Sequence, residues 1–353
     1  GRQNWFAAVG EEHKCVRQRV GIFDQSSFAK YELRGKDAAQ ALSWICANTV
    51  DRPVGKLTYT QLLNSQGGIE CDLTVARIAK DHFYIVTGTG FRTHDFAWIA
   101  DHIKPGLDAK LTDITEAYGT LSVMGPNSRA VIQTVTSSDM SNAAFKFGEV
   151  REIVIAGHKV GALRVTYVGE LGWELHMPIA AMGDVFDALM TAGRAYGMAP
   201  VGYRALESLR LEKGYRAWSS DITPNDTPLH AGLGWAVKMK TNQPFLGREA
   251  IEKISQAPLA KMLAGFTTER EDIVLSGRET ILRNGKFAGY LTSGGYGYTV
   301  AKPIGFGYVR DAAGVTHEYL AGGAYQLVVA NEIVKCNIHL EALYDPKNER
   351  VKA

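Results

Sequence analysis

Apolar residues in the first fifty positions follow a helical spacing, then a strand spacing, then a helical spacing again. Residues 11–20 carry apolar side chains at helical intervals, and Gly21 is placed to end that helix. The stretch 28–35 alternates apolar and polar residues, which predicts a strand. Asp37 can cap a second helix over residues 37–48, whose apolar residues share one face.

Three strand-like segments follow at short intervals. Residues 57–64, 69–78 and 83–88 are bounded by turn residues, and Gly67 and Gly68 give a strong turn signal between the first two segments. Because short turns join strands that run antiparallel to each other, we predict a β-meander here.

The middle of the chain alternates between strand and helix patterns. A helix is predicted near residues 96–103, and residues 121–135 have the pattern of a strand, a Gly-Pro turn and a helix. Residues 151–178 form a strand-rich block with glycine turns. Helical spacing returns in residues 185–197 and 203–214, and each segment ends on a glycine suited to a helix C-terminus. The region therefore predicts an α+β fold.

Helical periodicity fades from about residue 255 onward. Short strand patterns remain, and they are separated by turns at Asn284-Gly285, Gly294-Gly295 and Gly322-Gly323. This pattern is typical of a small all-β barrel or sandwich.

Length and composition indicate a globular protein of several domains. The 353 residues are too many for one ordinary core, and 46% are hydrophobic. The formal net charge of +2 gives no reason to expect a nucleic acid partner, and no apolar run approaches the ~18 residues that span a membrane. The sequence lacks an initial Met and an apolar signal region, so we expect it to be part of a longer chain.

Cysteine and histidine spacing predicts neither a metal site nor a redox motif. Cys15, Cys46, Cys71 and Cys336 form no C-x-x-C pair, and the nine histidines are scattered. The apolar neighbours of three of these cysteines favour core positions and a reducing compartment. The segment beginning at Gly88 is not a dinucleotide fingerprint, because Thr93 takes the place of its last glycine.

Asp72 is the first candidate for chemistry. Side chains alternate along the strand predicted over residues 69–78, so Asp72 shares a face with Glu70 and Thr74, opposite an apolar face. If the polar face were open to solvent, Asp72 would be an ordinary surface acid. If it lined a cleft, the carboxylate could orient an amine and stabilise an iminium-like cation.

Tyr167, Glu174 and Arg204 are candidates for holding a ligand. Tyr167 and Glu174 flank a glycine-containing kink, which would let them converge on one ligand, and a carboxylate can accept paired N–H bonds from an amino-heterocycle. The alternative is a buried tyrosine and a structural acid. Arg204 starts the helix over 203–214, where it opposes the helix dipole, and this favours it over Arg210 as a partner for an anionic ligand.

These motifs together resemble the aminomethyltransferase family, whose best-known member is the glycine-cleavage T-protein. The resemblance covers nearly the whole chain and rests on V-G-I-F-D-Q-S-S-F-A-K, Q-G-G-I-E-C-D-L-T-V, T-Y-V-G-E-L-G-W-E-L, G-Y-R-A-L-E-S-L-R-L-E-K-G and D-I-T-P-N-D-T-P-L. The closer resemblance is to the folate-binding C-terminal half of dimethylglycine and sarcosine dehydrogenases. In those proteins an FAD-containing amine-oxidising half precedes this part.

The resemblance implies a three-domain cloverleaf of α+β type that ends in a β-barrel. We expect a first α+β domain formed by residues 1–50 and 118–250, an inserted β-meander and helix domain over 51–117, and the barrel over 251–353. It also implies that Asp72 is catalytic. Six residues are expected to contact tetrahydrofolate, namely Tyr84, Val86, Gly88, Tyr167, Glu174 and Arg204.

The activity implied is transfer of a one-carbon unit to tetrahydrofolate, which forms 5,10-methylene-tetrahydrofolate. Cys71 stands where the T-protein has a further acid, and this favours a small amine or iminium donor over a lipoyl-bound group. The cysteine, glutamine and glutamate of the family's iron–sulfur-repair relatives are missing from residues 212–221.

Two alternative functions stay open. One is a folate-binding module without turnover that serves an FAD-dependent amine dehydrogenase domain or subunit. The other is a folate-dependent demethylase that acts on a methylated sulfur or oxygen compound. In each case a cytoplasmic location is expected, or the mitochondrial matrix in a eukaryote.

Overall fold

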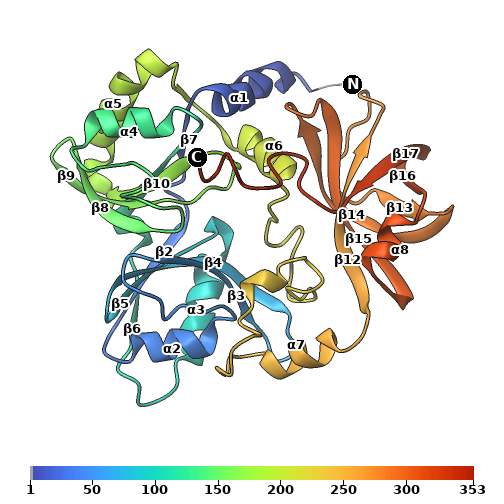
Figure 1. The fold of residues 1–353 in the computed structure, drawn as a ribbon, viewed down its shortest axis with the longest axis horizontal. Helices are drawn as coiled ribbons and strands as arrows, with labels where there is room; N and C mark the ends of the chain where they lie inside the picture. The colour runs from blue at the N-terminus through green and yellow to red at the C-terminus, as the bar shows by residue number, and fades with distance from the viewer. Residues whose placement is uncertain (1–2) are drawn as a thin grey trace.

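The chain folds into three lobes, each built on one β-sheet (Figure 1). A computed structural model describes residues 3–353. Helix α6 (Tyr203–Lys213) lies between the first lobe and the third, where it packs on α1 (Phe6–Gln18) and on strand β14 (Lys286–Gly297). The last six residues of α6 are all buried, so this part of the helix holds two lobes together.

The first lobe is a six-stranded sheet covered by two helices. Its strands, in spatial order, are β11 (Ala199–Pro200), β1 (Gly21–Asp24), β7 (Tyr118–Met124), β10 (Gly172–Pro178), β9 (His158–Leu163) and β8 (Val150–Ile155). Helices α4 (Ser128–Val135) and α5 (Met182–Gly193) pack on one face of this sheet. The fully buried Trp173 belongs to the core between them, so the neighbouring positions of β10 point to the opposite face.

The second lobe is a five-stranded sheet. Its strands, in spatial order, are β3 (Leu57–Leu63), β4 (Ile69–Ala79), β5 (His82–Thr87), β2 (Ala29–Arg34) and β6 (Lys110–Asp113). Helices α2 (Ala38–Ile45) and α3 (Arg92–His102) share an apolar core with it, and Cys71 belongs to that core. The face of β4 that carries Asp72 is the other one.

The third lobe is a closed barrel, one of the two architectures that the sequence pattern predicts. The turn expected at Gly294-Gly295 is wrong, because both glycines lie inside β14 and pair with β15. Its strands, in order, are β12 (Leu259–Thr268), β15 (Lys302–Val315), β14, β13 (Thr280–Arg283), β16 (Tyr325–Val329) and β17 (Glu332–His339). Strand β12 pairs with both β15 and β17, which closes the sheet and leaves no free edge. Helix α7 (Arg248–Ser255) precedes the barrel, and α8 (His317–Ala321) packs against its core.

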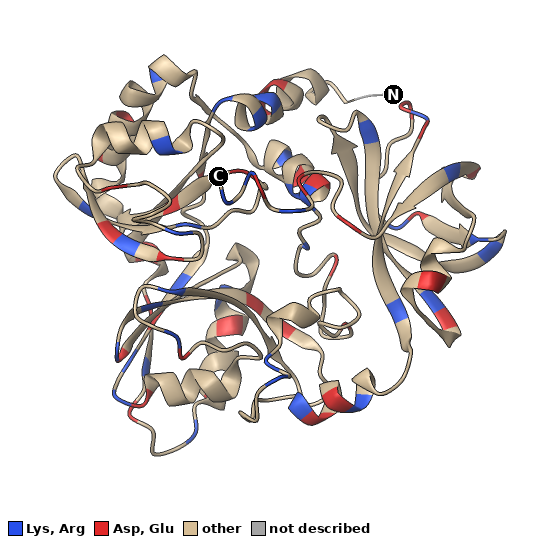
Figure 2. Ribbon diagram, viewed as in Figure 1, with Lys and Arg blue, Asp and Glu red and all other residues tan. Residues whose placement is uncertain are grey.

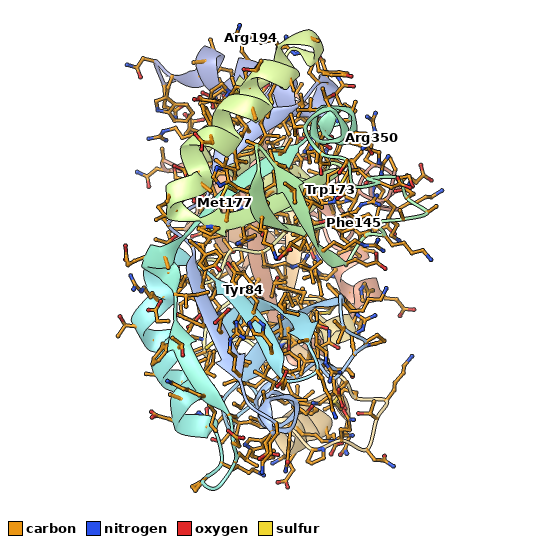
Figure 3. All side chains as sticks on the ribbon, turned by 90° about the vertical axis from the view of Figure 1, so that its left-hand side faces the viewer. Tyr84, Phe145, Trp173, Met177, Arg194 and Arg350 are labelled. Carbon is orange, nitrogen blue, oxygen red and sulfur yellow. The ribbon has the colours of Figure 1, made fainter. Side chains whose placement is uncertain are left out.

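An apolar cluster joins the first two lobes. Tyr84 and Val86 of β5 and Leu57 of β3 pack there against Val150 and Leu163 of the first lobe. Figure 3 shows Tyr84 between the two lobes. The cluster therefore brings the polar face of the second sheet against the first lobe.

A buried charge network joins α1, α6 and the barrel. The Arg17 guanidinium donates to Glu212 Oε2 at 3.0 Å and to Glu170 Oε1 at 3.1 Å, and it stacks on Tyr344 at 3.8 Å from the ring centre. Glu212 Oε1 accepts a hydrogen bond from the Thr299 amide of the barrel at 2.6 Å. Arg17 thus neutralises two carboxylates that would otherwise be buried without a cation.

The observed bounds of the first helix differ from the predicted ones. Helix α1 begins at Phe6 and ends at Gln18, and Gly21 begins β1 instead of ending the helix. A Cβ at Gly21 would lie 2.7 Å from side-chain atoms of Val16 and Val201, so this glycine permits close packing of β1. Asp37 precedes α2 as predicted, but its carboxylate accepts from the Asp108 amide at 2.9 Å, outside the helix.

The predicted domain boundary at residue 50 does not match the way the strands are divided between the sheets. Strand β2 pairs with β5 and β6, and α2 packs in the core of the second lobe, so both elements lie outside the first lobe to which they were assigned. A local pattern identifies a strand but not its partner, and β2 crosses to a sheet whose other strands come later in the chain. The remaining domain limits stay predictions.

Charged residues of both signs occur on all three lobes (Figure 2). Within residues 3–353, none of the helices combines the length and apolar character needed to cross a bilayer.

Candidate functional site

Asp72 lies on the polar face of β4, beside two of the predicted folate contacts. In the sheet register Thr74 pairs with Val86 and Ala76 pairs with Tyr84, so all these side chains project to the same face as Asp72. Leucine and cysteine neighbours of Asp72 along β4 are buried in the core on the opposite face. The predicted alternation is therefore confirmed. The polar face packs against the first lobe near Tyr84 and Val86, whereas Asp72 itself is half-buried.

The surroundings of Asp72 bring the pKa of its carboxyl group close to neutral pH. Burial raises the pKa of Asp72 to about 6, and the negative charge of Asp95 acts in the same direction. Hydrogen bonds from Tyr59 and Gln61 oppose this rise. A carboxylate whose pKa lies this close to neutral pH is suited to exchange a proton or to stabilise a cation.

Gln61 lies directly opposite Asp72 in the β3–β4 ladder. Its Nε2 donates to Asp72 Oδ1 at 2.9 Å. Its Oε1 is buried, and none of the described residues provides it with a hydrogen-bond donor. A buried acceptor without a partner costs free energy, so this side chain is held in a strained polar setting beside Asp72.

A chain of hydrogen bonds connects the second lobe to the first. The Tyr84 hydroxyl is 2.9 Å from His176 Nδ1, and His176 Nε2 is 3.5 Å from Glu174 Oε2. Thr120 Oγ1 also lies 3.1 Å from His176 Nδ1. Glu174 and His176 project from the face of β10 opposite its core residues. The predicted residues Tyr84 and Glu174 are thus brought together through a histidine.

Tyr167 is held near the same site from another direction. Its hydroxyl donates to the Arg216 carbonyl at 2.9 Å, and its ring stacks on Tyr215 with 6.0 Å between ring centres. Burial raises the pKa of Tyr167, and the charge of Asp72 contributes to the rise. The predicted kink is present, because Gly169 has a φ of +81°.

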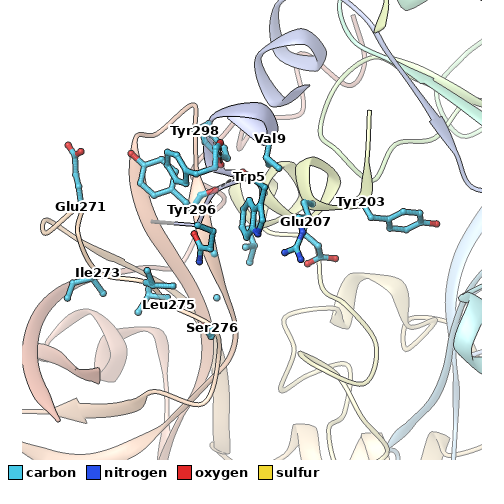
Figure 4. Close-up of a pocket in the computed structure, with 18 residues that line it drawn as sticks. Trp5, Val9, Tyr203, Glu207, Glu271, Ile273, Leu275, Ser276, Tyr296 and Tyr298 are labelled. Atoms are coloured by element: carbon cyan, nitrogen blue, oxygen red, sulfur yellow. Dashed lines mark hydrogen bonds between the residues drawn. The ribbon is translucent and has the colours of Figure 1, made fainter. Parts of the chain in front are cut away.

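Arg204 and Gly88 are not among the hydrogen-bonded residues described above. Arg204 is exposed, and its guanidinium carbon lies 4.3 Å from the centre of the Trp5 ring. It lines a cavity of about 390 Å³ between α1, α6 and the barrel (Figure 4). Among the described residues, no other predicted site residue lines that cavity. Gly88 directly follows β5 and precedes the short helix Thr89–Phe91.

Four residues near the site were missed by the sequence analysis. They are Tyr59, Gln61, His176 and Arg216. Antiparallel pairing of the first two meander strands could have suggested Gln61, but an irregularity between Leu62 and Leu63 shifts the register. Trp235 also lies near these residues: it is 70% exposed and stacks on Tyr59 with 5.7 Å between ring centres.

Comparison with known proteins identifies the family. The family model described as "GCVT N-terminal domain" matches residues 1–241, and the "Glycine cleavage T-protein C-terminal barrel domain" matches residues 261–345. The chain therefore belongs to the glycine cleavage T-protein family. The expected family and its cloverleaf fold with a C-terminal barrel are confirmed.

Some relatives are much longer than this chain, and others have about the same length. The chain is 39% identical to mitochondrial sarcosine dehydrogenase of Mus musculus over 98% of this chain, but it spans only 39% of that protein's length. It is 33% identical to the aminomethyltransferase of Halothermothrix orenii, covering 94% of this chain and 91% of that protein. The crystal structure of aminomethyltransferase T from Bartonella henselae matches with a TM-score of 0.84 and 26% identity, over 96% of this chain and 90% of that chain.

Proposed function

We propose that this chain transfers a one-carbon unit from a methylated or aminomethyl amine to tetrahydrofolate and so forms 5,10-methylene-tetrahydrofolate. The observation that carries the proposal is the environment of Asp72. This carboxyl group has a pKa of about 6, accepts a hydrogen bond from Gln61, and interacts electrostatically with Arg216 and Tyr167 from outside its own sheet. Such a group can orient a nitrogen nucleophile and stabilise a cationic donor.

The described residues suit tetrahydrofolate in two respects. The Glu174 carboxylate can accept paired N–H bonds from an amino-heterocycle. Tyr84, Val86 and Tyr167 would provide an apolar and aromatic boundary for the ring. When bound, tetrahydrofolate supplies the nitrogen atoms that receive the one-carbon unit.

Asp72 would act on the nitrogen that attacks the donor carbon. Its charge would stabilise the positive charge of an iminium donor, because a fixed carboxylate placed next to a developing cation lowers the energy of the transition state. Gln61 would hold the carboxylate in place through the 2.9 Å hydrogen bond. His176 would orient Glu174 and Tyr84 toward each other.

The donor proposed is a small amine that carries a methyl or methylene group on nitrogen. Relatives named sarcosine dehydrogenase and dimethylglycine dehydrogenase contain this kind of chain as roughly two fifths of their length, at 39% and 35%. An FAD-dependent amine dehydrogenase domain or subunit would generate the oxidised donor. Cys71, in place of an acid next to Asp72, supports a small donor over a protein-bound one.

Calorimetric titration with folinate tests the binding part of the proposal. Glu174→Ala should weaken binding by about 2 kcal/mol or more, because a charged acceptor is lost. Glu152→Ala, on the exposed face of β8, is the matched control and should bind as the parent does. Unchanged affinity in Glu174→Ala would remove Glu174 from the site. Stoichiometric folate binding without product from any donor would favour a binding module.

A further inference from the structure

Three potential metal ligands meet on the side of β4 opposite Asp72. Cys71 comes from β4, and His94 and Asp95 come from the first turn of α3. One ligand atom from each residue, namely a sulfur, a ring nitrogen and a carboxylate oxygen, lies within 4.8 Å of the other two. The fold brings these donors together from a strand and a helix that are separated by β5, so sequence spacing did not reveal the group.

Neighbouring groups orient the two ligands from α3. The Thr87 hydroxyl donates to Asp95 Oδ2, which leaves Oδ1 directed toward His94 Nδ1 at 2.9 Å. Glu70 Oε2 lies 3.6 Å from His94 Nε2 on the other side of the ring. A histidine held between a ligand position and a carboxylate, and a carboxylate held by a hydroxyl, are the outer contacts that accompany metal ligands in proteins.

Burial and access also suit a cation. Cys71 and Asp95 are each 1% exposed, whereas the His94 side chain is 45% exposed and provides a route from solvent.

We propose that Cys71, His94 and Asp95 form a binding site for Zn²⁺ or a chemically similar divalent cation, with solvent as a further ligand. Sulfur, imidazole and carboxylate ligands are those that Zn²⁺ accepts. Binding releases the thiol proton, and the thiolate and carboxylate then balance the two positive charges of the ion. A cation here would tie β4, immediately beside Asp72, to the start of α3.

Titration of the purified chain with Co²⁺ tests the site without any assay of folate chemistry. Co²⁺ bound to a thiolate gives a charge-transfer absorption in the near ultraviolet, and the expected result is saturation at one equivalent and reversal by Zn²⁺. Cys71→Ser should abolish this absorption, and His94→Asn should weaken Co²⁺ binding. Cys336→Ser and His158→Asn are the matched controls, because one alters another buried cysteine and the other alters an exposed histidine paired with Asp184.

The outcome separates a metal site from a hydrogen-bonded cluster. Thr87→Val should weaken Zn²⁺ affinity by roughly 10-fold to 100-fold, the loss typical when a contact behind a metal ligand is removed. Absence of the thiolate absorption in the parent chain, or its persistence in Cys71→Ser, would overturn the proposal. If Cys71→Ser does not fold, His94→Asn decides, because its partly exposed position tolerates the change; unchanged Co²⁺ affinity in that variant would equally overturn it.

Discussion

Replacement of Gln61 by Leu is expected to shift the pH dependence of turnover. Gln61 Nε2 donates to Asp72 Oδ1 at 2.9 Å, and this bond lowers the Asp72 pKa from the higher value that burial alone would give. A hydrogen bond to a charged group contributes about 1.5 to 3 kcal/mol. Because a pKa change of one corresponds to about 1.4 kcal/mol, losing this bond should raise the Asp72 pKa from about 6 to ~7–8.

The direction of the effect follows from the ionised form being the active one. Asp72 loses its charge as the pH falls through its pKa, so the acid limb of kcat/KM should lie near pH 6 in the parent. In Gln61→Leu that limb should move to higher pH. The variant should therefore be impaired most at neutral pH and should approach the parent in alkaline solution, apart from any loss due to the missing Oε1.

The assay follows formation of 5,10-methylene-tetrahydrofolate across the pH range, with a methylene-iminium donor generated by an added amine dehydrogenase. Formaldehyde condenses with tetrahydrofolate without an enzyme, so this background is subtracted at each pH. Gln326→Leu, on barrel strand β16, is the control and should keep the parent profile. An acid limb that stays in place in Gln61→Leu would refute the assigned role of the 2.9 Å bond.

Two further predictions concern stability. The pKa of Asp72 in the folded protein is above the ordinary 3.8, so the protein loses stability as the pH rises from about 4 to about 6. The free energy of unfolding in urea should therefore be about 1–3 kcal/mol higher in Asp72→Asn than in the parent at neutral pH, and the same as in the parent near pH 4. A less stable Asn variant at neutral pH would contradict this. Arg17→Met should lose ~3–5 kcal/mol, because Glu170 and Glu212 keep buried charges, whereas the exposed Arg19→Met should change little. Equal unfolding midpoints for the two variants would disprove the role of Arg17.

The sequence pattern predicts the strands well because alternation and turn residues act locally. The meander over β3, β4 and β5 and the strands of the barrel follow from such signals. The assignment of β2 to the second sheet could not be predicted, since it depends on pairing with strands that come later in the chain. The role of Gly21 could not be predicted either, because the sequence does not show that two valines approach it closely.

The candidate site was predicted only in part for a similar reason. Alternation along β4 correctly separated Asp72 from the core, but neither its raised pKa nor the unpaired oxygen of Gln61 can be seen without the fold. Arg216 follows α6 in an irregular segment that has no pattern of its own. Arg204 was predicted beside the folate site, yet its described contact is with Trp5 in a separate cavity, so its role stays a prediction.

Turnover of Asp72→Asn is the most direct test of the proposed transferase activity. Asn keeps the shape of the side chain and removes its charge, so folinate affinity should stay close to that of the parent. Formation of 5,10-methylene-tetrahydrofolate should fall by ~10²-fold or more, because the charge acts mainly in the transition state. Turnover within about threefold of the parent would contradict a catalytic role for Asp72 and would favour a folate-binding module without its own chemistry.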